Sequence, residues 1–404
     1  MSLLRNIKIV EFAQGIAGPL AALRLADLGA DVIKCEDIQG DWLRGAAPLI
    51  PGTTMSAAFF ELNRGKRSMQ LDSDPHAAGA TLRQLLREAD VFITDRPQKE
   101  LAAFGLSAGE DTDASPCPEN TGLITVEISG WGHRGPLRDR PGSELTAQAM
   151  AGYTRYLGEF GKPACRLGAD VASAGTGIFA CQAVLAALFA RARERCGGQR
   201  VSLSLLNSLI SLKSIHLAAQ SDPDSYAGPR VGGANYPPER GWKTRDNPIF
   251  FAFGGSVGAQ GRPGWVNFIE EAGFTRLLED PRFDKIGRST TGYGIRVPET
   301  RGEYEKEFAR YSANELVDLI RKHAGNAASY MRADETIAHP QTQALKVVRE
   351  VPMSGHTPVR VRAFPARFSR TAAHTPGDAP PLGRDTAAIE AALNASPGKW
   401  PGRH

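Results

Sequence analysis

The alternation of apolar and polar positions near the start of the chain predicts a strand, a helix and a second strand. Residues 7–11 and 31–35 are short β-rich runs, and residues 17–28 between them have apolar side chains at helical spacing. Gly18 and Pro19 open that helix and Gly29 follows its end, as helix start and stop signals do. This order predicts a βαβ unit, which requires two parallel strands joined by a crossover.

The same two periodicities continue to about residue 218. Further strands are predicted at residues 68–71, 90–94, 123–128 and 199–204, and further helices at residues 80–89, 178–190 and 205–218. Strands that alternate with helices are typical of an α/β fold with a parallel sheet.

The composition changes after about residue 220. Residues 221–247 are rich in Pro, Gly, Asp and Arg, which indicates a linker. A strand at 250–253 and helices at 265–272, 314–323 and 387–393 are predicted beyond it, with a flexible glycine loop at 254–258. Since 404 residues exceed one ordinary core, we predict three segments. They are the N-terminal part of a large domain (1–220), a smaller α/β domain with its linkers (221–344) and a C-terminal segment that returns to the large domain (345–404).

Composition and charge exclude several classes of protein. With 42% hydrophobic and 23% charged residues the chain is an ordinary globular protein, and a net charge of +4 gives no case for nucleic acid. Five cysteines without a CxxC pair favour a reduced, cytoplasmic interior over disulfides or zinc. The loop after the first strand lacks GxGxxG, which argues against a nicotinamide cofactor. We find no apolar run long enough to span a bilayer, so we expect no membrane contact.

Residues 163–199 combine a small, glycine-rich first half with an apolar second half. The apolar run at 178–190 ends in Arg191 and Arg193, which predicts a turn that leads into a buried helix. Asp170 and Ser173 are therefore expected just before a helix N-terminus, where free N–H groups can hold a carboxylate or an oxyanion. The simpler alternative is that one of them only caps the helix.

Several motifs resemble those of the family III CoA-transferases, and the resemblance covers nearly the whole chain. They are AGPLAALRLADLGADVIKCE (17–36), GDWLR (40–44), LNRGKRS (62–68), SGWG (129–132), GPLRDRPG (135–142) and PPLGRDT (380–386). The resemblance implies a large Rossmann-like parallel-sheet domain with a smaller α/β domain, in an interlocked dimer. It also implies coenzyme A or acyl-CoA as substrate, with no metal, nicotinamide or flavin.

The resemblance implies covalent catalysis by a carboxylate. In this family an aspartate attacks the acyl-CoA thioester and forms a mixed anhydride, which only Asp or Glu can do. Ungapped counting from LAAL (185–188) and from RLG (166–168) places that aspartate at Ser173. Asp170 is the nearest carboxylate, so we predict Asp170 as the nucleophile and keep Ser173 as the alternative register. A serine can form an ester if a base lies nearby.

The resemblance also implies the residues that contact coenzyme A. From the residues alone, Arg64, Lys66 and Arg67 can meet phosphates, or they can form a solvated basic turn. The predicted contact residues are Ile16, Ala17, Leu62, Asn63, Arg64, Gly65, Lys66, Asp95 and Arg96.

Some positions depart from the family pattern. Asp37 stands where the family commonly has an arginine near the CoA phosphates, and Asp95 with Arg96 replaces an Asn-Phe pair. The racemase branch needs a histidine where this chain has Ser143, followed by Glu144, so racemase chemistry is disfavoured. We predict an acyl-CoA:carboxylate CoA-transferase that forms a homodimer. The alternative is a non-catalytic CoA-binding partner subunit of a heteromeric CoA-transferase.

Overall fold

The computed structural model divides the chain into two compact units. Unit 1 comprises Met1–Gly152, Arg166–Lys213 and Gln343–His404, and unit 2 comprises Tyr153–Cys165 and Ser214–Thr342. The structure describes residues 2–106, 115–154, 163–194, 196–219, 221, 241–253, 264–283, 297–353, 355–373 and 377–402. The predicted glycine loop at 254–258 and most of the predicted linker at 221–247 lie outside these residues.

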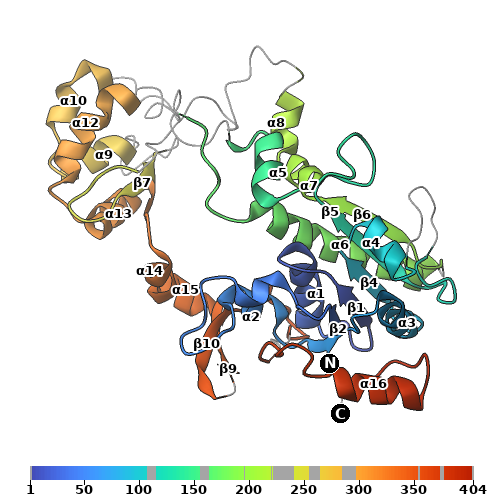
Figure 1. Cartoon of the computed structure of the whole chain (residues 1–404). Coiled ribbons are helices and arrows are strands. Elements are labelled where there is room, and N and C mark those ends of the chain that lie inside the picture. The colour runs from blue at the N-terminus through green and yellow to red at the C-terminus, as the bar shows by residue number, and fades with distance from the viewer. Residues whose placement is uncertain are drawn as a thin grey trace. The chain divides into compact units, whose positions relative to one another are not determined.

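Unit 1 is built on a six-stranded sheet whose strands have the order β3-β2-β1-β4-β5-β6 (Figure 1). The strands are β1 (Lys8–Phe12), β2 (Asp31–Glu36), β3 (Arg67–Gln70), β4 (Val91–Thr94), β5 (Ile124–Ser129) and β6 (Arg200–Ser204). Each neighbouring pair is parallel, so the predicted parallel α/β sheet is confirmed. The strand order reverses between β1 and β4, and the loops that follow these two strands therefore diverge at the carboxyl edge.

Helices cover both faces of this sheet because strand side chains alternate between the faces. Val10, Phe12 and Phe92 pack in one cluster with residues of α3 (Pro75–Leu86) and α16 (Thr386–Ala395). On the other face lies α1 (Ala17–Asp27), where a Cβ on Gly18 would be 3.7 Å from Ile93 Cγ2. The remaining helices described in unit 1 are η1 (Trp42–Gly45), α2 (Ala57–Asn63), α4 (Gln98–Ala103), α5 (Glu144–Met150), α6 (Val171–Glu194) and α7 (Leu205–Leu212).

The helix α6 begins seven residues earlier than predicted, at Val171 instead of residue 178. Gly175 and Gly177 therefore lie inside the helix, although glycine costs about 1 kcal/mol per residue there. At Gly177 a Cβ would lie 2.7 Å from the Ala17 carbonyl oxygen, so the missing side chain lets α6 approach α1 closely. This packing offsets the poor helix propensity and moves Ser173 into the first helical turn, with Asp170 just before it.

The length and composition of α6 would also allow it to span a membrane. The prediction that no apolar run reaches this length is therefore wrong. Within unit 1, however, the helix packs against α1, α7 and β5 (Figure 1). This packing is that of a core helix, whose buried side chains include Ala180, Val184 and Ala187.

Unit 1 also contains an antiparallel hairpin of β9 (Val348–Met353) and β10 (His356–Arg362). Val351 and Val361 from this hairpin share a cluster with Phe59 and Phe60 of α2. Arg64 Nη2 donates a hydrogen bond to the Arg362 carbonyl, across a sequence separation of 298 residues. The C-terminal part of the chain thus packs with segments that lie far earlier in the sequence.

Unit 2 has a small antiparallel sheet of β7 (Ile249–Ala252) and β8 (Asn326–Ser329). Its core is aromatic: the rings of Trp242, Phe251, Phe283 and Phe308 contact Tyr304. The Tyr304 hydroxyl accepts a hydrogen bond of 2.8 Å from Trp265 Nε1. The predicted helix at 205–218 is interrupted after α7, and its second part is α8. The helical elements are α8 (Ser214–Ala219), α9 (Gly264–Glu271), α10 (Arg276–Glu279), η5 (Pro281–Phe283), α12 (Val297–Phe308), α13 (Ala313–Lys322), α14 (Ala333–Ala338) and, at the boundary of the units, α15 (Pro340–Leu345).

Candidate active site

The loops after β1 and β4 bring four of the predicted contact residues to the point where the strand order reverses. Ile16 and Ala17 begin α1 directly after β1, and Asp95 and Arg96 follow β4. The Gln14 amide donates a 2.9 Å hydrogen bond to Asp95 Oδ2 and ties the two loops together. In open parallel sheets, ligands bind in the crevice outside the carboxyl ends of the strands at such a point.

Two side chains give this crevice its charge. Burial raises the pKa of Asp95 to about 6, against the opposing effects of the Gln14 amide and Arg96. Arg96 forms ion pairs with Asp37 (3.1 Å) and Glu100 (2.7 Å), and its guanidinium lies over the Phe12 ring. A phosphate group that binds here would therefore compete with two carboxylates for Arg96.

The cations of the predicted loop at 62–67 are buried and paired within the protein. Lys66 Nζ contacts Glu11 Oε2 at 2.6 Å and donates to Asn63 Oδ1 at 2.8 Å. Arg64 contacts Asp27 at 3.2 Å, and the side chains of Arg64 and Lys66 are both 0% exposed. A ligand at this loop would meet its partly exposed residues, Leu62 and Gly65, rather than these two charges.

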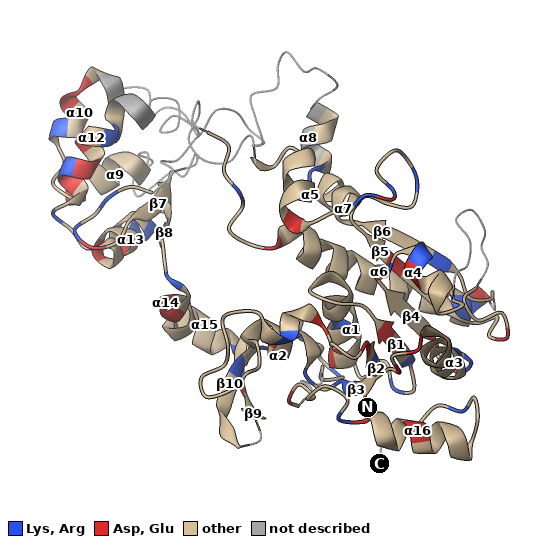
Figure 2. Ribbon diagram, in the orientation of Figure 1, with Lys and Arg blue, Asp and Glu red and all other residues tan. Residues whose placement is uncertain are grey.

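A buried ion network shapes the loop between β1 and α1, and sequence reasoning did not find it. Lys34 Nζ lies 2.9 Å from Glu11 Oε1 and 3.0 Å from Asp41 Oδ2. Asp41 also accepts a hydrogen bond from the amide of Gly15, whose φ of 69° favours glycine. In Figure 2, acidic and basic positions lie close together among the first strands of unit 1. Charged residues inside the apolar runs IKIVE and DVIKCE were the available signal.

The N-terminus of α6 holds a carboxylate that comes from α5. The Ala172 amide donates to Glu144 Oε1 at 2.8 Å, and the Ser173 amide donates to Oε2 at 2.8 Å. The Ser173 hydroxyl donates to the same Oε2 at 2.7 Å, and Gln148 Nε2 donates to Oε1 at 2.8 Å. Partial burial raises the pKa of Glu144, but these hydrogen bonds hold it below its usual range.

The two residues predicted for catalysis have different surroundings. Asp170 is exposed, and its main-chain carbonyl accepts a hydrogen bond from the Ala174 amide, as the residue before a helix does. Ser173 is only 9% exposed and is bound to Glu144. The contact between Gly177 and the Ala17 carbonyl places this end of α6 beside the loop that follows β1. Within unit 1, the start of α1 and the first turns of α6 therefore lie close together.

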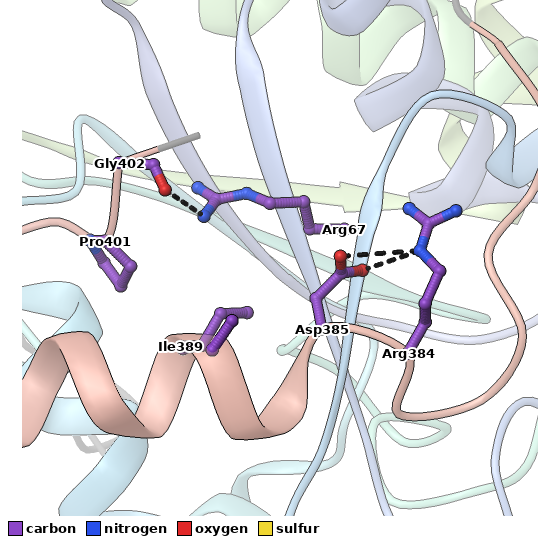
Figure 3. Close-up of a pocket in the computed structure, with 7 residues that line it drawn as sticks. Arg67, Arg384, Asp385, Ile389, Pro401 and Gly402 are labelled. Carbon is purple, nitrogen blue, oxygen red and sulfur yellow. Dashed lines mark hydrogen bonds and ion pairs between the residues drawn. The ribbon is translucent and has the colours of Figure 1, made fainter. Parts of the chain in front are cut away.

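A cavity of about 300 Å³ lies elsewhere in unit 1, between Arg67, Arg384, Asp385, Ala388, Ile389, Pro401 and Gly402 (Figure 3). Arg67 opens β3, so the cavity is at the amino edge of the sheet, opposite the crevice. Arg67 Nη1 donates to the Gly402 carbonyl, and Arg384 contacts Asp385. The hydrogen bond between Arg67 and Gly402 joins the C-terminal segment to the sheet. None of the residues predicted as catalytic lines the cavity.

Comparisons with known proteins agree with this arrangement. The model of CoA-transferase family III matches residues 4–386. The succinate–glutarate CoA-transferase of Agrobacterium fabrum is 29% identical over 96% of this chain and 95% of its own length. The formyl-CoA:oxalate CoA-transferase of Streptomyces avermitilis is 30% identical over 69% of each chain.

A solved structure supports the same relationship. The crystal structure of a CaiB/BaiF family protein from Brucella suis superposes with a TM-score of 0.83 at 26% identity. The superposition covers 97% of this chain and 99% of that one. The match therefore includes the parallel sheet, the crevice loops and the helices described above. The chain belongs to CoA-transferase family III.

Proposed function

We propose that this protein transfers coenzyme A between an acyl-CoA and a carboxylic acid through a carboxylate of its own. The family and the names of its relatives support a transferase that acts on acyl-CoA thioesters. The observation that carries the proposal is the contact of α6 with the loop after β1, which joins a ligand crevice to a helix N-terminus that holds a carboxylate. No metal, nicotinamide or flavin takes part in the proposed reaction.

In the proposed mechanism, an enzyme carboxylate oxygen attacks the thioester carbonyl carbon. The C–S bond breaks, CoA leaves as the thiolate, and an acyl anhydride remains on the enzyme. The thiolate then attacks the enzyme's carbonyl, which releases the first acid and leaves an enzyme–CoA thioester. The second acid reverses these steps, and the sequence consumes no proton or electron.

For the ligand, we propose that the crevice accepts the CoA portion. Ile16, Ala17, Asp95 and Arg96 would contact it from two loops, and Leu62 and Gly65 are the partly exposed residues of the third segment. Asn63, Arg64 and Lys66 would support that segment from within, since all three are buried. Asp170 is the nucleophile predicted from the sequence, with Ser173 as the alternative register.

We further propose that the protein is an interlocked cytoplasmic homodimer. The resemblance to the family implies the dimer. Ile178 and Phe189 on α6 are 51% and 63% exposed, which leaves apolar surface for a partner to cover. The five cysteines are all free, as is usual in the reducing cytoplasm.

One observation favours a second candidate, a non-catalytic CoA-binding partner subunit. Ser173 stands where the ungapped register puts the family's aspartate, and its hydroxyl is bound to Glu144. A serine cannot form an anhydride. This candidate predicts CoA binding without turnover.

An exchange assay separates the two candidates. The purified protein is incubated with succinyl-CoA, formyl-CoA or propionyl-CoA together with a panel of carboxylic acids, and new acyl-CoA is measured by chromatography. We expect a new thioester whose formation requires both the donor and the acid. CoA binding without exchange for any pair would favour the partner subunit, and absence of binding would contradict both candidates.

A further inference from the structure

Two carboxylates lie near the start of α6, and only one of them is held by donors. Glu144 accepts hydrogen bonds from the amides of Ala172 and Ser173, from the Ser173 hydroxyl and from Gln148. Among the described residues, none donates a hydrogen bond to the carboxylate of Asp170, which is exposed. The site therefore fixes the position and charge of Glu144 and leaves the Asp170 side chain to solvent.

The geometry at Ser173 shows that the site holds one ionised carboxylate at a time. The Ser173 hydroxyl oxygen is 2.7 Å from Glu144 Oε2. An aspartate at position 173 would place its carboxyl carbon where that hydroxyl is, with its two oxygens against Glu144. Two carboxylates at such a distance cannot both be ionised. Ser173 and Glu144 are therefore complementary: this chain has the hydroxyl on α6 and the carboxylate on α5.

We propose that Glu144 is the nucleophilic carboxylate of this protein and that Ser173 is the residue that positions it. This inference rests on the proposed CoA-transferase function and deepens it by assigning the reacting atom to Glu144 Oε2. Glu144 is half-buried, so it keeps the partial exposure that an attack on a thioester requires. The helix N-terminus keeps the carboxylate ionised.

Rotation of the Ser173 hydroxyl can free a lone pair of Glu144 Oε2 for attack on the thioester. The carboxylate accepts four hydrogen bonds, which fill the usual acceptor positions of its two oxygens. Three of the donors are two main-chain amides and one side-chain amide, and their positions are fixed by the helices that carry them. The hydroxyl can turn away by rotation about one bond, which frees a lone pair on Oε2. The same hydroxyl can then donate to the oxyanion that forms on the thioester carbonyl.

The chemical steps balance at Glu144. Oε2 bonds to the thioester carbonyl carbon, the C–S bond breaks and the thiolate leaves with the electron pair. The thiolate then attacks Glu144 Cδ, the anhydride C–O bond breaks, and the first acid leaves as its carboxylate. The second acid attacks Cδ in turn, displaces the thiolate and finally passes its acyl group back to sulfur.

The experiment maps the enzyme-bound intermediate on the full chain. The protein is incubated with succinyl-CoA or propionyl-CoA, quenched with hydroxylamine, digested and analysed by mass spectrometry. We expect a hydroxamate on Glu144. A modification on Asp170 or Ser173 would overturn the inference while leaving the CoA-transferase function intact. Exchange without a trapped residue would also overturn it, and absence of both exchange and adduct would refute the proposed function as well.

Substitutions give a second readout. Glu144→Gln should lower exchange by more than about 1,000-fold while CoA binding persists, whereas Glu390→Gln on the exposed face of α16 serves as the matched control. The double variant Glu144→Gln with Ser173→Asp should recover measurable exchange, since it returns the carboxylate to α6. If Glu144→Gln retains full exchange, the assignment is wrong.

The positioning role of Ser173 has its own signature. Ser173→Ala should lower kcat about tenfold with little change in KM, because one hydrogen bond to a charged group is lost. The acid limb of the kcat profile should move to higher pH, because that hydrogen bond helps to hold the Glu144 pKa down. A serine that only caps the helix would change stability and leave the pH profile in place, and that result would overturn its role.

Discussion

At the scale of single residues, charges inside unit 1 hold the candidate site in shape. Lys34 and Lys66 share the two oxygens of Glu11 beneath α1, and Asp41 connects this network to the Gly15 amide. Buried ions are costly unless each has partners, so such a network tolerates few arrangements of the surrounding backbone. The loop that carries Ile16 and Ala17 is therefore fixed before any ligand arrives.

Asp95 offers a test of the crevice through stability. Burial raises its pKa to about 6 in the folded protein from 3.8, so folding favours the protonated form. The charged form thus destabilises the fold above pH 6, and this penalty disappears as the pH falls through 6 toward 3.8. Asp95→Asn should raise the free energy of unfolding at pH 7 by about 1–2 kcal/mol, with no gain near pH 3.5.

The measurement is urea denaturation at both pH values, with unfolding monitored by circular dichroism. Asp318→Asn on α13 is the control, because this exposed carboxylate lies outside the crevice. An equal effect of Asp95→Asn at both pH values would show that burial of the charge is not its cause.

At the scale of elements, α6 organises the site because it packs against α1 and carries the predicted catalytic segment at its start. Its register depends on Gly177, where the Ala17 carbonyl leaves no room for a side chain. The first turn of the helix then meets Glu144 of α5, which comes 29 positions before Ser173 in the chain. Three helices thus determine where the reactive groups lie.

Gly177→Ala tests this contact. Its Cβ would lie 2.7 Å from the Ala17 carbonyl oxygen, which forces α1 and α6 apart. We expect a loss of about 1–3 kcal/mol in the free energy of unfolding, despite the better helix propensity of alanine, together with reduced exchange activity.

Gly302→Ala in α12 is the matched control, because among the described residues nothing beyond its own helix backbone and chain neighbours lies within 4 Å of an added Cβ. It should stabilise by up to about 1 kcal/mol. If both variants stabilise the protein equally, the close approach at Ala17 does not matter.

At the scale of the whole molecule, the chain forms two units with separate cores, and unit 1 draws on three distant parts of the sequence. Its C-terminal part shares cores with the N-terminal part: Ile389 belongs to the same cluster as Val10 of the sheet, and Val351 belongs to the same cluster as Phe59 of α2. A chain with this connectivity leaves and re-enters the same unit. The proposed interlocked dimer makes a direct physical prediction for such a chain.

Subunits that thread through one another cannot separate without unfolding. Sedimentation should therefore give twice the 43.4 kDa mass of one chain at every concentration. Tagged and untagged dimers, mixed in native buffer, should not form hybrids until they are denatured and refolded together. A stable monomer would contradict the dimer, and rapid formation of hybrids would contradict the interlocked arrangement.

The sequence by itself determined the periodic elements, since each depends on residues close together in the chain. The six strands of the parallel sheet and helices such as α1, α9 and α13 follow from apolar spacing and end signals such as Gly29, whereas α2, α5 and α12 were not predicted. Asp74 and Pro75 show a local signal that was missed: Asp74 accepts from the amides of His76 and Ala77, and α3 begins five residues before the predicted start.

Tertiary structure alone decided which charged groups meet. The start of α6 depends on the contact between Gly177 and Ala17, and local propensity favoured a turn there. From the sequence, Arg64 and Lys66 were expected to be solvated or to bind phosphate. In the structure both are buried and form ion pairs with Asp27 and Glu11 from other segments. Counting along the chain could compare only Asp170 with Ser173. Glu144 enters the site because α5 packs beside α6, and hydrogen bonds between distant residues leave no periodic trace in a sequence.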